Sequence, residues 1–167
     1  MAPEFTREAR NIRARLDRDE SELFRRLVAE MHTLLTDDGG PTELIRGRLF
    51  PNAYEAPEDE RAYRELVGDD LQRAKLEAVE TVAEAITSDS PIDVAIPESQ
   101  IDAWLTLLTD MRLAIGTRLG VDEDTMASEV EIDDPNAPAL TVMHWLAWMQ
   151  EMILEELTTS AENQGGT

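Results

Sequence analysis

Apolar residues recur at steps of three and four along most of the chain, the spacing of one face of an α-helix. The longest such run lies between Pro97 and Gly120, where a proline suits the first helical turn and a glycine suits a left-handed cap. Its apolar members are Ile101, Trp104, Leu105, Leu108, Met111, Ile115 and Leu119. We therefore predict that this stretch is the central helix of a helical domain.

Four other segments have helical patterns. They are residues 19–38, 42–49, 58–87 with a break near Gly68, and 138–158. The first begins with Asp19 and Glu22, which have the spacing of a capping box, and it ends before two glycines. These segments and the central one predict a bundle of about five helices.

Period-two alternation, which is typical of strands, appears at three places. Near the N-terminus, Arg13 and Arg15 alternate with apolar neighbours, and residues 92–96 and 130–132 show the same pattern. We expect these segments to form a β-hairpin or a small sheet of two or three strands. An edge strand protected by charge explains the two arginines more simply than a nucleic-acid contact does.

The fold class predicted is therefore mostly α, with one domain over residues 1–158. Residues 1–18 form its N-terminal strand region, and residues 159–167 are expected to be a disordered tail. The 167-residue chain has no apolar run long enough to span a membrane, and residues 1–10 lack the apolar core of a signal peptide. We expect a cytoplasmic protein.

The net charge of the chain limits the classes of partner that it can bind. The chain has 36 acidic and 15 basic residues, a net charge of −21, which opposes binding to phosphate polyanions and favours basic partners. Residues 1–30 are the exception, with seven arginines and seven acids, so any contact with nucleic acid would involve this end. The chain has no cysteine, which excludes disulfides, thiol switches and thiolate metal sites.

Two cations fall on apolar helix faces. Arg112 lies within the apolar face of the central helix, and Lys75 projects onto the inward side of its own helix. A buried cation needs an acid and further acceptors, so we predict a buried polar cluster that joins Arg112 and Lys75 to Asp70 and to Gln150, which lies on an apolar face of the last helix. The alternative is that both cations reach solvent along their aliphatic stems.

The last helix is apolar almost all the way round. One face carries Trp145, Trp148, Met149 and Met152, which are residue types enriched at interface cores. We predict that this face binds a protein partner or a second copy of the chain. The alternative is that the helix is central and that the small sheet covers this face.

Other motifs indicate structure more than chemistry. Phe50 and Tyr54 flank Pro51, and we expect both rings to anchor the turn in the core. The acidic residues between 122 and 134 lack the glycine and the terminal glutamate of an EF-hand loop. We find no phosphate loop, no nucleophile triad and no metal-spaced histidines, so we predict no catalytic, cofactor-binding or metal-binding residues.

Three motifs carry a resemblance to a known family: RLFPNAY (48–54), WLTLLTDMRLAIGTRLG (104–120) and HWLAWMQ (144–150). Over about residues 12–157 the chain resembles an actinobacterial family of unknown function, encoded near the ClpS adaptor gene and sometimes described as an oxidative-stress transcriptional regulator. The positions that match the family pattern are Phe50, Pro51, Tyr54, Lys75, Arg112, Gly116, Arg118 and Leu119. The resemblance implies a cytoplasmic regulatory protein that acts through a transcription or proteolysis partner. A redox-sensing cysteine pair is impossible in this chain.

We therefore predict a non-enzymatic regulatory protein-interaction module that functions in transcription or stress regulation. A direct DNA-binding regulator is one alternative, although no helix has a row of Arg and Lys on one side. An uncharacterised enzyme is the other alternative.

Overall fold

The computed structural model describes residues 3–36, 69–88, 90–119 and 137–165. Over these residues the protein is mostly α-helical, with four α-helices and one three-stranded antiparallel sheet. The predicted fold class is confirmed, although the helix count over these residues is four instead of about five. The predicted short helix at 42–49 and the strand at 130–132 lie outside the described residues.

The sheet consists of β1 (Glu4–Glu8), β2 (Asn11–Arg15) and β3 (Asp93–Pro97), in the order β1-β2-β3. β2 and β3 were predicted from their alternation, whereas β1 was not. β1 and β2 form a hairpin whose two-residue loop includes Ala9 with a φ of 53°, the positive φ that tight hairpin turns require. Arg7 supports this turn, because its Nε donates a hydrogen bond to the Ala9 carbonyl oxygen at 2.8 Å.

The first helix, α1 (Arg18–Thr36), begins one residue before the predicted segment 19–38, and its N-cap lies two residues before the predicted one. Its capping box uses Asp17 and Glu20 in place of Asp19 and Glu22. The Glu20 backbone N–H donates to Asp17 Oδ1 at 2.9 Å, and the Asp17 N–H donates to Glu20 Oε1 at 3.0 Å. The bond from the Glu20 N–H lowers the pKa of the Asp17 carboxyl.

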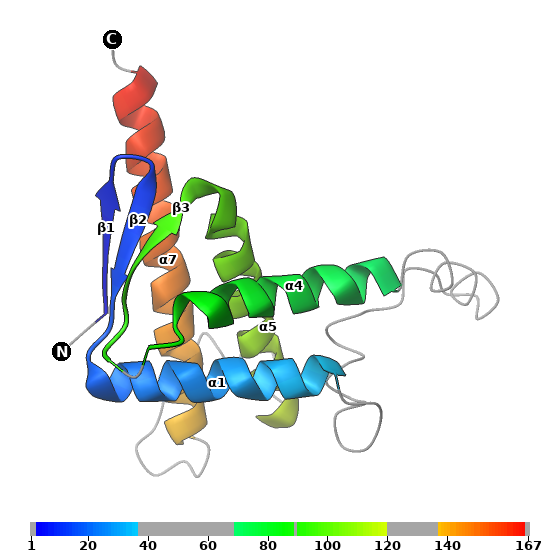
Figure 1. The fold of residues 1–167 in the computed structure, drawn as a ribbon. Helices are drawn as coiled ribbons and strands as arrows, with labels where there is room; N and C mark the ends of the chain where they lie inside the picture. Colours follow the sequence, from blue (N-terminus) through cyan, green and yellow to red (C-terminus); the bar gives the residue numbers. More distant parts are fainter. Residues whose placement is uncertain (1–2, 37–68, 89, 120–136, 166–167) are drawn as a thin grey trace.

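The other helices are α4 (Asp69–Ala85), α5 (Ile101–Leu119) and α7 (Ala137–Gly165). A short 3-10 helix, η3 (Glu98–Gln100), links β3 to α5. Helix α7 continues to Gly165, so the predicted helix end near Thr158 and the predicted disordered tail are wrong over these residues. In Figure 1, the last turns of α7 extend past the β1-β2 hairpin.

The elements are arranged around α5, as the sequence predicts. Figure 1 shows α1 and α4 side by side, running across the direction of α5 and α7, while the sheet lies beside α7. Helix α5 packs against α4 and α7, and α7 also packs against β1.

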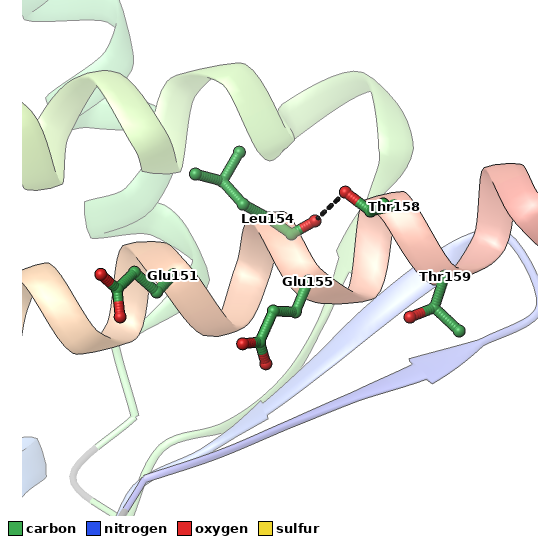
Figure 2. A pocket seen from close by; sticks show the side chains of 5 residues that line it. All are labelled: Glu151, Leu154, Glu155, Thr158 and Thr159. Atoms are coloured by element: carbon green, nitrogen blue, oxygen red, sulfur yellow. Dashed lines mark hydrogen bonds between the residues drawn. The ribbon is translucent and has the colours of Figure 1, made fainter.

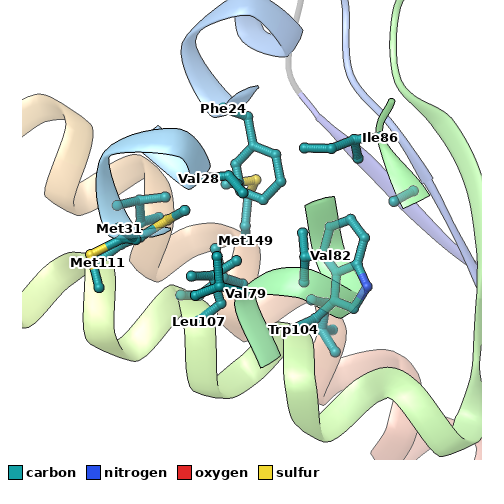
Figure 3. Close-up of a cluster of buried hydrophobic side chains, with 14 of the residues drawn as sticks. Phe24, Val28, Met31, Val79, Val82, Ile86, Trp104, Leu107, Met111 and Met149 are labelled. Carbon is teal, nitrogen blue, oxygen red and sulfur yellow. The ribbon is translucent and has the colours of Figure 1, made fainter. Parts of the chain in front are cut away.

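One continuous apolar core joins these elements (Figure 3). Trp104 of α5 is fully buried and stacks on Phe24 of α1, with ring centroids 5.7 Å apart. Trp145 of α7 meets the same Phe24 ring edge-on at 6.5 Å. These aromatic contacts hold α1, α5 and α7 together without any polar interaction.

Candidate functional site

The first polar feature is a buried ion pair between α4 and α5. Lys75 Nζ of α4 lies 2.9 Å from Asp110 Oδ1 and 3.1 Å from Asp110 Oδ2. Asp110 is only 3% exposed, and its burial raises the pKa of the carboxyl, an effect that the lysine opposes. The ion pair links α4 to α5. Each charge would be costly to bury without the other.

The second polar feature lies between α5 and α7. Arg112 is half-buried, and its Nη1 donates to Gln150 Oε1 at 2.8 Å. Gln150 Nε2 in turn donates to Thr109 Oγ1 at 2.6 Å and to the Leu105 carbonyl oxygen at 3.2 Å. The amide is therefore oriented by α5 so that its oxygen faces the guanidinium.

The predicted single cluster is thus two separate pairs. Arg112 and Asp110 are two residues apart on α5, a turn of about 200°, so they point to opposite sides of the helix. Asp70, which we predicted to be the acid of the cluster, has a side chain that is 76% exposed and lies 3.9 Å from Arg73. Asp70 does not belong to a buried cluster, because the start of α4 leaves its carboxylate in solvent.

The acid that the sequence analysis missed is Asp110. A signal for it exists, because Leu107, Asp110 and Ala114 are spaced by three and four residues and all three are buried. An acid within such a row indicates a buried carboxylate that needs a cation. Lys75 was the correct cation, and its partner lies on the neighbouring helix.

The apolar face predicted for partner binding on α7 is divided by the structure. Met149 is 1% exposed and belongs to the core, so its assignment to a binding surface is wrong. Trp145 and Met152 are half-buried and pack against the core. Only Trp148 is exposed, at 38%. Helix α7 packs against α5 and β1, and Trp145 of this face meets Phe24 of α1.

The contact with β1 includes a direct hydrogen bond. The Arg7 backbone N–H donates to a carboxylate oxygen of Glu156 on α7 at 3.1 Å. This bond occupies one backbone group at the edge of the sheet. The sheet therefore contacts α7 through β1, whereas Trp145 on this face meets Phe24 of α1 and Trp148 stays exposed.

The remaining exposed strip of α7 combines Trp148 with two acids. Glu151 and Glu155 follow Trp148 by three and seven residues, so the three side chains share one side of the helix. Figure 2 shows the two carboxylates projecting together from α7, at an open groove that is also lined by Leu154, Thr158 and Thr159. Among the described residues, neither glutamate has a hydrogen-bond or ion-pair partner. We name Trp148, Glu151 and Glu155 the outer strip of α7.

Other charged groups near the N-terminus are used within the fold. Arg13 bonds to Glu8 Oε2 at 3.0 Å and to Asp93 Oδ1 at 2.7 Å on the outer side of the sheet. The hydrogen bond from Arg13 lowers the pKa of the Asp93 carboxyl. These bonds link the three strands, and they hold Arg13 on the outer side of the sheet as its alternation predicts. The prediction of an edge strand is wrong, because β2 is the central strand and pairs with both β1 and β3.

Arg25 of α1 is also engaged. Its Nε donates to the Ile86 carbonyl oxygen at 2.9 Å, and its Nη2 donates to the Ser90 carbonyl oxygen at 2.6 Å. Ile86 directly follows α4, where a cation satisfies carbonyl groups at the helix end, and Ser90 lies four residues further along the chain. This arginine therefore holds α1 to the end of α4.

Over the described ranges, no group of three or more His, Asp or Glu side chains is arranged to hold a metal ion. None of the helices in the described part of the chain is long and apolar enough to cross a membrane. Phe50 and Tyr54 lie outside the described residues, so their anchoring role stays a prediction.

The fold described here is a small helical domain with a three-stranded sheet. The chain belongs to the family described as a domain of unknown function, DUF2017, whose profile matches residues 1–157. No curated protein and no solved structure shows significant similarity to it.

Proposed function

We propose that this chain is a non-enzymatic regulatory protein-interaction module, acting in transcription or stress regulation, and that it binds its partner through the outer strip of α7. The observation that carries the proposal is the exposure of Trp148 on a helix whose other large aromatic, Trp145, packs against the core. Tryptophan is the residue type most enriched among the energetically dominant positions of interfaces.

The setting of Trp148 supports this proposal. Its neighbours on the strip, Glu151 and Glu155, are exposed acids without partners among the described residues, so the surface is open to a second molecule. A contact built on one aromatic anchor with a polar rim is the common anatomy of protein interfaces. A second copy of the chain and a different protein both fit this description, and the experiment below separates them.

Direct DNA binding is less well supported. The net charge of −21 opposes it, and Arg13 and Arg25 already bond to groups within the fold. A salt titration separates the two functions, because DNA binding through several phosphates weakens by about 10³-fold or more between roughly 50 and 200 mM salt.

The test compares Trp148→Glu with Leu113→Glu. Leu113 of α5 is a matched control because it is 42% exposed, so both changes place an acid on an exposed apolar position. Light scattering would give the molar mass of each variant, pull-down from native extract would compare bound proteins, and circular dichroism would confirm folding. We expect Trp148→Glu to stay folded and to lose the dimer or the partner, while Leu113→Glu keeps it. Equal behaviour of the two variants, or unfolding of Trp148→Glu alone, would contradict the proposal.

A further inference from the structure

The outer strip of α7 has a definite charge character. Helix α7 contains no lysine or arginine from residue 137 to residue 165, and its exposed side carries Glu151 and Glu155 beside Trp148. Several other carboxylates in the described part of the chain are occupied. Those of Glu8, Asp93 and Asp110 form ion pairs, and that of Glu156 accepts a backbone hydrogen bond. The outer strip therefore presents unpaired acids beside an exposed indole.

We infer that the partner of the outer strip is a basic, amphipathic protein segment, which places a lysine or arginine over the Trp148 ring and pairs a second cation with Glu151 and Glu155. This inference rests on the proposed function, because it specifies the chemistry of the same surface.

The chemistry of the three side chains supports a cation as the ligand. The face of an indole attracts a guanidinium or ammonium group, and arginine is the cation found there most often. Glu151 and Glu155 are four residues apart, so their Cβ atoms lie about 5–6 Å from each other. A single basic residue of the partner, placed between the two carboxylates, can therefore pair with both.

The length of the strip limits the size of the contact. From Trp148 to Glu155 the helix rises about 10 Å, which corresponds to roughly two turns of a partner helix. Leu154, at 49% exposed, lies beside the acids and offers a contact for an apolar residue of the partner (Figure 2). The occupant is therefore a segment with both basic and apolar residues, in preference to a uniformly charged tail.

Net charge favours the same class of partner. A chain of −21 attracts basic proteins and repels acidic ones, and this attraction raises the rate of encounter. General attraction is not specific to α7, however, so the experiment must separate the outer strip from the overall charge.

The probe is a short labelled amphipathic peptide with arginines one turn apart and leucines on its opposite face. A second peptide replaces each arginine with citrulline, which keeps the shape and removes the charge. Binding of both peptides to the full chain would be measured by fluorescence anisotropy at low and high salt. We expect the arginine peptide to bind more tightly, with an affinity that falls as salt rises.

Matched variants locate the site. Glu151→Gln with Glu155→Gln should weaken binding about five- to tenfold, since each exposed ion pair contributes up to about 1 kcal/mol. Glu80→Gln with Glu84→Gln on α4 removes the same charge from exposed positions with the same spacing, and it should weaken binding less than about twofold. Trp148→Leu should weaken binding about threefold, because it keeps apolar area and loses the attraction of the ring for a cation.

Equal weakening by the two glutamine pairs would show that overall charge alone binds the peptide, and it would overturn the inference. Absence of binding by the arginine peptide, or equal binding of the citrulline peptide, would also overturn it. The proposed function has a separate readout, because Trp148→Glu would still remove the dimer or the partner in the earlier experiment. If that variant removes neither, the proposed function fails, whatever the peptides do.

Discussion

Helix α5 meets its two neighbours in different ways. Against α4 it uses a charged pair, with Asp110 bonded to Lys75 through both carboxylate oxygens. Against α7 it uses a cation and a neutral amide, with Arg112 bonded to Gln150. Both contacts place a cation at a helix interface, but only the first supplies an opposite charge.

Lys75 and Arg112 are both half-buried, so the difference lies in the buried acid that only Lys75 has as its partner. Asp110 is almost fully covered, so its charge requires a cation at close range. Arg112 is half-buried, and its Nη1 has a neutral amide, that of Gln150, as its partner. Arg112 Nε nevertheless is buried without a hydrogen-bond partner in the described structure. The polar contact of α5 with α4 is therefore an ion pair, whereas its polar contact with α7 is a hydrogen bond between a cation and a neutral amide.

Lys75→Met should have the largest effect, with a loss of about 3–5 kcal/mol in the free energy of unfolding at neutral pH. The change leaves the Asp110 carboxylate buried without its cation. Urea unfolding of the variant and the wild type would measure the loss. The double variant Lys75→Met with Asp110→Leu should recover most of the stability, because no charge remains buried. A double variant as unstable as the single one would show that the pair is not the source of the loss.

The loss in Lys75→Met should shrink as the pH falls. Burial raises the pKa of the Asp110 carboxyl, so the folded protein binds this proton more tightly than the unfolded chain does. The Asp110 carboxyl therefore stabilises the fold most when the pH is below its pKa in the unfolded chain. This stabilisation is lost as the pH rises through its pKa in the folded protein. Removal of Lys75 strengthens this shift, because the lysine opposes it. Urea unfolding from neutral pH to about pH 4, with Asp110→Asn as the reference, tests the expectation. A loss that does not change with pH would contradict it.

Gln150→Leu should cost less, about 1–3 kcal/mol, because it removes the acceptor of a half-buried arginine. Arg112→Met should cost less than Gln150→Leu, since it keeps the apolar stem and removes the cation itself. Thermal unfolding of both variants would rank them. If Arg112→Met were the more damaging change, the guanidinium would contribute more than its bond to Gln150, and the contrast between the two contacts would weaken.

Gly116→Ala should have the smallest effect, within about 1 kcal/mol of the wild type. An added Cβ at this position of α5 would lie 3.1 Å from Met143 Cε, the flexible end of a side chain on α7. The gain in helix propensity, about 1 kcal/mol, should offset the movement of Met143. Gly116→Leu is the control, because its larger side chain would separate α5 from α7. Equal unfolding temperatures for Gly116→Leu and the wild type would show that the two helices do not depend on close approach here.

Local patterns predicted much of the fold. The step of three and four residues located α5, and the alternation near Arg13 located β2 with its arginines on the outer side. β1 was missed because Glu4, Thr6 and Glu8 make its pattern polar, and it is stabilised as a strand by its pairing with β2. The N-cap of α1 was placed two residues late, because Asp17 and Asp19 are both acceptable caps and only the hydrogen bonds distinguish them.

The residues of the candidate site were also predicted only in part. The sequence identified Trp148 but grouped it with Met149, which the structure buries. Helical periodicity places residues on a face of one helix, but it does not say which neighbour covers that face. β1 and α1 decide this for α7, and their approach depends on contacts between residues far apart in the sequence.

By itself, the sequence determined that Lys75, Arg112 and Gln150 fall on apolar helix faces, because side-chain direction follows from helical periodicity within a single element. Only the tertiary structure decided which groups meet. In the tertiary structure Lys75 pairs with Asp110 and Arg112 bonds to Gln150, while Asp70 stays in solvent. The physical reason is that a buried charge is stabilised by whichever opposite charge or dipole the packing brings within hydrogen-bonding distance, and packing joins helices whose relative positions no local pattern records.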